Sequence, residues 1–371
     1  MQQIKASLKG FLAALALPIV ALLVSFLFAA FLITLVDVDP IEAFQAFLYG
    51  IAGNKVNIGN VLSVATPLML CGLGIAFAAQ SSVFNIGAEG QLYVGAIFAV
   101  ATGLRFGDQP AYILLPLILV AGFVGGGIWG FIPGILKAKY SVNEIVMTVM
   151  LTEIAIQLVS WVTRGPMLDP DGFGIPQTAM LPEAGQIPLL LKGTRLHGGL
   201  LIALISAVVL YFLLYKTTFG YRVRAVGFNP FASRYAGMGV ISGVSLSMLI
   251  SGGLAGVAGA IEVAGVHYRL MDGISPGYGF TALVVSLLGK RHPFGVVLSA
   301  ILFSALQAGA DAMQRKVAVP VHLALIIQAM TILLVIVFEY VKTYHLHIAR
   351  DYVVGLFRGS NNDEAAAQVE N

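Results

Sequence analysis

Apolar segments long enough to cross a lipid bilayer recur along the whole chain, and this recurrence limits the possible fold more than any other feature. A membrane-spanning helix needs roughly 20 mainly apolar residues. Of the 371 residues, 58% are apolar and only 11% are charged, whereas a soluble protein carries about 25% charged residues. The sequence therefore excludes an ordinary soluble enzyme and predicts an all-α polytopic membrane protein.

About ten transmembrane helices are expected. They lie at 11–36, 60–79, 88–105, 111–136, 143–162, 198–215, 241–264, 275–289, 294–310 and 321–341. The first segment is too long for the core of a signal peptide and lacks a clear cleavage site, so we expect it to be retained. One transmembrane domain is expected over residues 1–358, with a disordered polar tail at 359–371.

The distribution of basic residues predicts the orientation in the membrane. With the N-terminus inside, thirteen of the 21 basic residues fall on the inner side, as cytoplasmic loops are enriched in Lys and Arg. Both termini are then cytoplasmic, the loop 163–197 is outside and the segment 216–239 is inside. That inner segment has four basic residues and no acidic one. Asn229 as N-cap and Pro230 at the first helical position predict a short helix within it, lying against a partner.

Polar residues interrupt the apolar pattern at SSVFNIGAEGQ, residues 81–91, which contains Asn85, Glu89 and Gln91 between glycines. The apolar segment that follows is too short to span a membrane alone. We therefore expect a broken or re-entrant segment near 81–91 whose polar side chains line a substrate path. The alternative is a cytoplasmic turn with a solvated Glu89, but the segment has no Lys or Arg, which favours the path.

Three further carboxylates lie in or beside predicted spans. Glu144 either lines the path or starts a helix in a capping box with Ser141, and the sequence favours neither. Glu153 is expected at a helix interface or a cavity, because a carboxylate that faces lipid is costly. For the same reason Glu262 is expected at a helix interface or a cavity. The alternative is a position at the outer membrane interface.

Two aromatic residues, Tyr278 and Phe280, stand among glycines at the expected outer start of a span. Aromatic side chains at this depth commonly anchor a helix at the membrane interface. They could equally stack on a planar substrate that enters from outside. The anchor is the commoner role, and both residues stay candidates for the substrate path.

Small residues recur every fourth position in two predicted spans. The positions are Gly122, Gly126, Gly130 and Gly134 in one span, and Gly252, Gly256, Ala260 and Ala264 in the other. Such stripes let two helix backbones approach closely. We expect a structural role for both stripes.

Sequence patterns of common enzymes and metal sites are missing. The sequence has no P-loop and no HExxH motif, and Cys71 is its one cysteine, so neither a metal site nor an internal disulfide is expected. Nothing indicates a nucleic-acid surface. Any energy from ATP must therefore come from another chain.

Four stretches resemble the permease subunits of bacterial ABC importers of the nucleoside branch, within the class that also moves ribose-type sugars and branched-chain amino acids. They are FNIGAEGQ at 84–91, SVNEIVMTVML at 141–151, RAVGFNPFASRYAGM at 224–238 and GYGFTALVVSLLGKRHPFGVVLSAILFSAL at 277–306. The octapeptide is the stretch specific to the nucleoside branch. The chain departs from the family at Gln80, near which members often carry a basic residue, and at Thr152, near which they often carry Asn.

The resemblance implies a multi-pass permease of the bacterial cytoplasmic membrane that is not itself an enzyme and holds no cofactor. It implies a second, homologous permease subunit, an ABC ATPase that binds ATP and Mg²⁺, and a lipid-anchored or periplasmic substrate-binding protein. Asn229, Pro230, Arg234 and Tyr235 would dock on the ATPase. Asn85, Glu89, Gln91, Glu144, Tyr278 and Phe280 would line the path of a nucleoside.

Other kinds of transporter remain as alternatives. The same type of complex could move ribose-like sugars. A proton-coupled secondary transporter would use Glu89, Glu153 or Glu262, and a passive channel would need no coupling at all. A self-sufficient carrier has no need of a docking segment at 224–238, which favours the ABC importer.

Overall fold

The computed structural model describes residues 27–34, 38–320 and single positions between 323 and 337. These residues divide into two units, one made from Met1–Gly50 and Gly309–Asn371 and the other from Ile51–Ala308. Helices dominate both, and the described residues contain only two isolated β-bridges. The all-α class predicted from the sequence is confirmed.

Long helices form the second unit, which we call the helix bundle (Ile51–Ala308). Its helices and those that extend beyond it are α3 (Lys55–Ala79), α4 (Ala88–Arg105), α5 (Ala111–Tyr140), α6 (Glu144–Arg164), α7 (Gly199–Lys216), α8 (Thr218–Phe228), α9 (Pro230–Tyr235), α10 (Val240–Ile261), α11 (Tyr278–Leu288) and α12 (Pro293–Val317). A π-helix, η2 (Glu262–His267), continues α10. Each span predicted between residues 60 and 310 coincides with a helix.

Six helices of the described residues are long and apolar enough to cross a membrane: α3, α5, α6, α7, α10 continued by η2, and α12. α11 has 11 residues, which at about 1.5 Å per residue falls short of a bilayer core of about 30 Å. α4 has Glu89 and Gln91 in its first turn and ends at Arg105, and it is not among the six. The protein is thus a multi-pass membrane protein. The spans predicted at 11–36 and 321–341 lie mostly outside the described residues, so the count of ten stays a prediction.

Two helices, α3 and α10, form the centre of the helix bundle. Within their most apolar windows 89% and 83% of residues are buried, against 28% for α6 and α7. Small residues explain why α10 can lie so deep. A Cβ at Gly126 of α5 would come within 2.6 Å of the Gly256 Cα of α10, and one at Gly130 within 2.6 Å of the Met248 carbonyl. The two predicted small-residue stripes therefore pack against each other.

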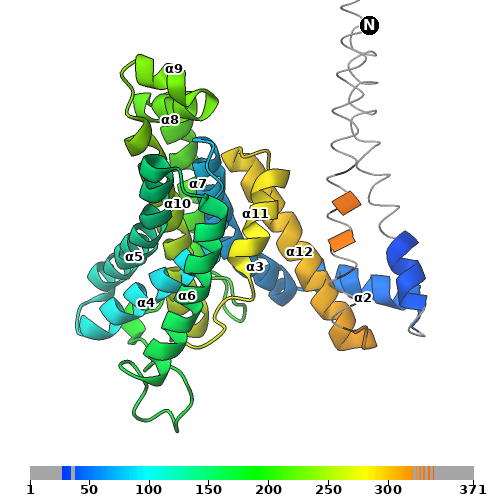
Figure 1. The fold of residues 1–371 in the computed structure, drawn as a ribbon. Helices are drawn as coiled ribbons and strands as arrows, with labels where there is room; N and C mark the ends of the chain where they lie inside the picture. The colour runs from blue at the N-terminus through cyan, green and yellow to red at the C-terminus, as the bar shows by residue number, and fades with distance from the viewer. Residues whose placement is uncertain are drawn as a thin grey trace, which may run out of the picture. The chain divides into compact units, whose positions relative to one another are not determined.

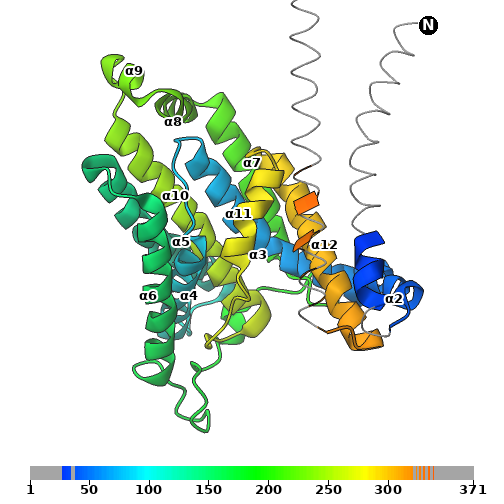
Figure 2. The same cartoon turned by 45° about the vertical axis from the view of Figure 1, so that its right-hand side comes forward.

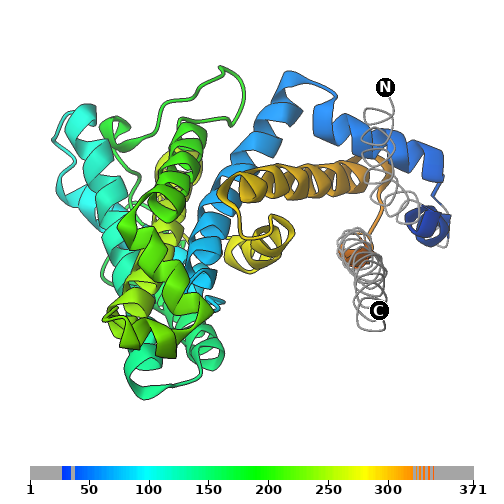
Figure 3. The ribbon, with the colours of Figure 1, turned by 90° about the horizontal axis from the view of Figure 1, so that it is seen from above.

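The two ends of the helix bundle differ in structure. α8 and α9 lie together at one end, and the long loop that follows α6 lies at the other (Figures 1 and 2). Seen from above, α8 and α9 lie across the near end of the bundle (Figure 3). The loop contains a short 3-10 helix, η1 (Glu183–Gly185), and is bonded to the segment after α10 through Thr178 N–H to Leu270 and Leu181 N–H to Tyr268.

The other unit contains the helical residues 27–34, most of α2 (Pro40–Ala52) and the C-terminal end of α12. α2 was not predicted from the sequence. Within this unit, the Phe44 and Phe47 rings stack at 6.4 Å and Lys316 Nζ lies 3.3 Å from the centre of the Tyr49 ring. The predicted tail at 359–371 lies outside the described residues.

Candidate functional site

The helix break predicted near 81–91 is present between α3 and α4. α3 ends at Ala79, Ser82 takes a left-handed conformation with φ of 57°, and α4 starts at Ala88. Residues 83–86 between these points are not helical. The backbone here cannot satisfy all its own hydrogen bonds, so side chains must do so.

Asn85 meets part of this need by accepting from a backbone N–H, and its side chain is held by Gln91. Asn85 Nδ2 donates to Gln91 Oε1 at 2.7 Å, and Gln91 Nε2 donates back to Asn85 Oδ1 at 3.0 Å. Asn85 also donates to the Ser251 hydroxyl of α10 at 2.8 Å and accepts from the Gly87 N–H at 3.1 Å. Both side chains are buried, with at most 1% exposed. The pair fixes the break and ties it to the central helix.

Glu89 ties the start of α4 to the start of α11. Its Oε2 accepts from the Gly279 N–H at 2.6 Å, near the N-terminus of α11, where the helix dipole favours a carboxylate. A Cβ at Gly279 would overlap the Glu89 backbone, so glycine is required for this approach. Glu89 is 2% exposed, so the solvated Glu89 of the alternative interpretation is wrong, whereas the side of the membrane on which the break lies stays a prediction. We call Asn85, Glu89, Gln91 and Ser251 the polar knot.

The polar knot faces the protein in this conformation. The bonds of Asn85, Glu89 and Gln91 described above run to one another, to α10 and to α11. Their role in lining a substrate path stays a prediction. Polar side chains can be buried inside a membrane-spanning bundle only where hydrogen-bond partners in the protein replace water.

Glu144 begins α6 beside the end of α5. Its Oε2 lies 2.8 Å from Lys137 Nζ. The N-cap of α6 is Asn143, whose Oδ1 accepts from the Ile145 and Val146 N–H groups, while Ser141 is left-handed and belongs to the end of α5. The predicted capping box of Ser141 and Glu144 is wrong, because the chain turns too sharply at Ser141 for that residue to cap α6.

Tyr278 and Phe280 lie in the first turn of α11, a helix that is shorter than the span predicted at 275–289. The Ser275 hydroxyl caps this helix by accepting from the Gly277 and Tyr278 N–H groups at 3.2 and 3.0 Å. Phe280 is 43% exposed and Tyr278 is half-buried. The exposed phenyl ring of Phe280 has no polar group that needs a hydrogen-bond partner. Its position therefore fits both predicted roles, a membrane anchor and a surface that stacks on a planar substrate.

The other two membrane carboxylates have opposite environments. Glu262 is buried in η2 with its Oε2 3.6 Å from His267 Nε2. Its depth in the membrane, and with it the alternative of a position at the outer interface, stays a prediction. Glu153 is exposed in the middle of α6. The π-helix that holds Glu262 has no periodic signal in the sequence.

The short helix predicted after Asn229 is α9. The Asn229 side chain accepts from the Ala232 N–H at 3.0 Å and Pro230 takes the first helical position. Arg234 is exposed, and so are three aromatic side chains: Phe228 (90%), Phe231 (76%) and Tyr235 (95%). A cap fixes this helix in place while its aromatic and basic side chains remain uncovered, which is typical of a protein interface.

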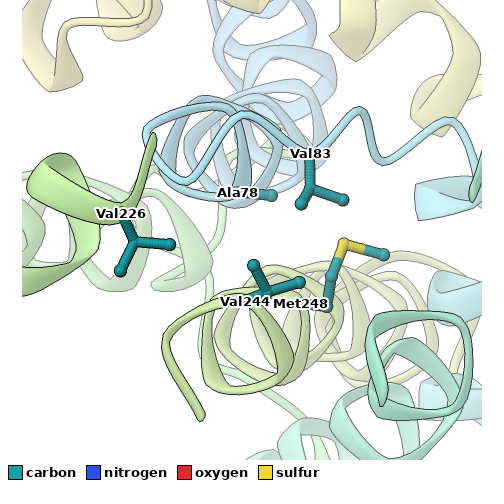
Figure 4. Close-up of a cluster of buried hydrophobic side chains, with 5 residues drawn as sticks. All are labelled: Ala78, Val83, Val226, Val244 and Met248. Atoms are coloured by element: carbon teal, nitrogen blue, oxygen red, sulfur yellow. The ribbon is translucent and has the colours of Figure 1, made fainter. Parts of the chain in front are cut away.

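α8 is bonded directly to the break. The Ser82 hydroxyl donates to the Gly227 carbonyl at 2.7 Å, and a Cβ at Gly227 would overlap the Gln80 carbonyl oxygen. Behind this contact lies an apolar cluster that joins α3, the break, α8 and α10 (Figure 4). Its members are Ala78, Val83, Val226, Val244 and Met248. A displacement of α8 would therefore act on the break and on α10 together.

Gln80 and Thr152, where the chain departs from the resembled family, both lie against the break. Gln80 Nε2 donates to the Arg291 carbonyl at 3.2 Å, and a Cβ at Gly90 would come within 2.6 Å of the Thr152 Cα. Thr152 is fully buried and bonds to the Thr148 carbonyl. Both departures are thus accommodated by local contacts.

At the opposite end of the bundle His197 is buried before α7. Its Nδ1 accepts from the Gly199 N–H at 3.1 Å and its Nε2 lies 3.5 Å from the Ser63 hydroxyl. Burial lowers the pKa of His197 to about 4, because a charged imidazole would lose its hydration. The sequence did not single out this residue, since one histidine next to an apolar segment carries no pattern.

Comparison with known proteins identifies relatives over most of the chain. It is 39% identical to the guanosine ABC transporter permease protein NupP of Bacillus subtilis (strain 168), covering 86% of this chain and 92% of the relative. It is 35% identical to the glucose ABC transporter permease protein TsgB13 of Haloferax volcanii, covering 90% of each chain. It is also 28% identical to a second guanosine permease protein of the same Bacillus subtilis strain, NupQ, covering 68% of this chain and 81% of the relative.

No solved structure matches the chain. The family described as branched-chain amino acid transport system / permease component matches residues 57–336. This match includes the polar knot, α6 and the segment α8–α9. The chain belongs to this family of ABC transport permeases.

Proposed function

We propose that this chain is a permease subunit of an ATP-driven ABC importer that takes up nucleosides delivered by an extracytoplasmic binding protein. The observation that carries the proposal is the exposed α9 surface, which α8 connects through Ser82 and Gly227 to the break between α3 and α4. A carrier that works alone has no use for such a surface. The guanosine permease among its relatives supports a nucleoside as cargo.

The ATPase would dock on α9. Asn229 and Pro230 fix the start of α9. Arg234 and Tyr235 present a positive charge and an aromatic face to the ATPase. ATP and Mg²⁺ would bind on the ATPase subunit, with no cofactor in this chain. Closure of the nucleotide sites would then move α8 and, through it, the break.

A second, homologous permease would complete the membrane part of the complex. Its support is that the chain is similar to two different guanosine permease proteins of one bacterium. With α8 and α9 on the cytoplasmic side, both termini are cytoplasmic and the loop 163–197 receives the binding protein. The complex would lie in the bacterial cytoplasmic membrane.

The cargo path would pass the break. Asn85, Glu89 and Gln91 would reach it when the helices move, with Glu144 at its inner end and Tyr278 and Phe280 along it. Amide and carboxylate groups can bond to ribose hydroxyls and to base edges. A path without a tight internal site suits a cargo handed over by a separate binding protein.

A sugar is the second candidate cargo, and the relative named as a glucose permease favours it. Ribose-like sugars and glucose share hydroxyl groups with nucleosides but have no planar base. A proton-coupled secondary transporter would instead rely on Glu89, Glu153 or Glu262. These three candidates differ in cargo or in energy source.

Uptake of radiolabelled guanosine separates them. Cells would express this chain with the subunits encoded beside it, with and without a substitution of the Walker A lysine in the ATPase. The proposal predicts guanosine uptake that the substitution abolishes. Uptake that survives the substitution and collapses with the proton gradient would contradict an ATP-driven importer. Uptake of glucose or ribose but not of guanosine would show that the cargo is a sugar.

A further inference from the structure

Four polar side chains share one face of α6. Glu153, Gln157, Ser160 and Arg164 follow one another at intervals of four, three and four residues, which places them in one row along the helix. Three of them are exposed and Ser160 is half-buried. We call them the polar row. The buried face of α6, which carries Thr148, Thr152 and Val159, is a different one.

The position of Glu153 along α6 limits what the polar row can face in the membrane. Glu153 is the tenth residue of the 21-residue α6, so it lies about 15 Å from either end of the helix and near the middle of a hydrocarbon core of about 30 Å. Within the described residues no hydrogen bond or ion pair reaches it. Because a carboxylate in lipid is costly, this face of α6 needs water or polar groups against it.

A hollow lies at the outer end of the polar row. Its volume is about 310 Å³ and its lining residues are Gln157, Ser160, Trp161, Arg164 and Gly165. Arg164 is held in place by Asp272, at 2.8 Å, and the Ser160 hydroxyl donates to the same carboxylate at 3.3 Å. The indole of Trp161 is 63% exposed. The hollow thus combines a flat aromatic face with amide, hydroxyl and guanidinium groups.

The segment 272–280 connects this hollow to the polar knot. It begins at Asp272, bonded to the outer end of α6, and reaches Gly279, whose N–H donates to Glu89. Phe280, exposed by 43%, follows directly. Through this segment the hollow is linked by the chain itself to the polar knot.

We propose that the polar row and Trp161 form the outer half of the cargo path and the surface that recognises a nucleoside there. The base would stack on Trp161, and the ribose hydroxyls would bond to Gln157 and Ser160. Glu153 keeps the path hydrated at mid-membrane. This inference rests on the proposed function and names residues outside the polar knot.

Thiol labelling in the whole complex tests the inference. Cys71 is the one cysteine of the chain and is buried, so a Cys71→Ala background removes it. Gln157→Cys and Ser160→Cys would be exposed to a membrane-impermeant methanethiosulfonate reagent in intact cells, with and without guanosine. Ile205→Cys is the matched control, because Ile205 is 61% exposed at a similar distance from the outer end of α7.

We expect Gln157→Cys and Ser160→Cys to react roughly tenfold faster than Ile205→Cys, since thiol reactivity needs access to water, and guanosine to slow the reaction. Reaction as slow as at Ile205 would overturn the inference and indicate a dry interface with the second permease. Reaction that guanosine leaves unchanged would overturn the recognition of cargo.

Uptake in the same cells separates this inference from the proposed function. ATP-dependent guanosine uptake by the Cys71→Ala complex together with slow labelling would overturn the path on α6 alone. Loss of guanosine uptake in cells with the native, assembled complex would instead overturn the proposed function.

Discussion

The polar knot and the polar row contain similar side chains, a glutamate, a glutamine and a serine each, yet they differ in burial. In the knot, Asn85, Glu89 and Gln91 are at most 2% exposed and bond within the chain. In the row, Glu153 and Gln157 are exposed on a membrane-spanning helix. Burial with internal bonds suits side chains that hold helices together, whereas exposure on a membrane-spanning helix suits the role in the cargo path that we propose for the row.

The largest expected effect is on the stability of the knot. Asn85→Leu would leave both polar atoms of the Gln91 amide, and the Gly87 N–H, without the partner they have now. We expect a loss of roughly 2–4 kcal/mol of folding free energy, because buried groups without partners cost about 1–3 kcal/mol each. Thermal unfolding of the purified complex measures it.

The matched control is the double variant Asn85→Leu/Gln91→Leu. Removing both partners costs less than the sum of the two single changes if the pair is what matters. Costs that simply add would contradict the mutual bonding of these two amides.

The second prediction concerns charge in the knot. Glu89→Gln keeps an oxygen that can accept from the Gly279 N–H but removes the carboxylate charge. We expect assembly to persist and guanosine uptake to fall roughly tenfold, equivalent to about 1.4 kcal/mol. Normal uptake by the assembled variant would leave Glu89 with a purely structural role.

The third prediction concerns the connection between α9 and the knot. Arg234→Glu reverses the charge of the exposed α9 surface, and we expect substrate-stimulated ATP hydrolysis by the complex to fall about fivefold through lost complementarity. Lys55→Glu, at the exposed start of α3 and at the opposite end of that helix from α8, is the control and should leave hydrolysis unchanged. Equal rates for both variants would show that α9 is only a solvated segment.

The smallest effect is a pH dependence at His197, which is buried and neutral. Its folded-state pKa of about 4 lies below the ordinary 6.5, so the unfolded chain binds the proton first as pH falls. Stability is therefore complete above pH 6.5 and is lost toward pH 4, by about 1 kcal/mol between pH 7 and 5.5.

Unfolding midpoints measured across this pH range test the effect of His197. In His197→Asn the side chain keeps an acceptor for the Gly199 N–H and does not titrate. An identical pH profile in this variant would show that a group other than His197 causes the loss of stability.

Helix positions could be predicted from the sequence because each long helix is marked by an apolar run, and α9 could be predicted from its cap at Asn229 and Pro230. The small-residue stripes likewise indicated close helix packing, although they did not show that α5 and α10 are each other's partners. The span predicted at 275–289 is longer than α11, because Ser275, Pro276 and Gly277 lie outside the helix and the apolar run ends at Leu288. α2 and the π-helix η2 have no distinctive pattern.

The candidate site was only partly accessible to sequence reasoning. Asn85, Glu89 and Gln91 stood out because polar residues interrupt an apolar region. Their bonds to α10 and α11 were hidden, since the partners Ser251 and Gly279 lie more than 150 residues away along the chain. The polar row could have been recognised by its spacing on α6, but only the structure reveals which face of the helix is exposed.

The contrast between knot and row is tested most directly by Gln157→Leu, with unfolding temperature and guanosine uptake measured on the same complex. Because Gln157 is exposed and Asn85 is buried, we expect an unchanged unfolding temperature and uptake reduced roughly tenfold. An unfolding temperature lowered as much as in Asn85→Leu, or uptake equal to that of the unchanged complex, would contradict it.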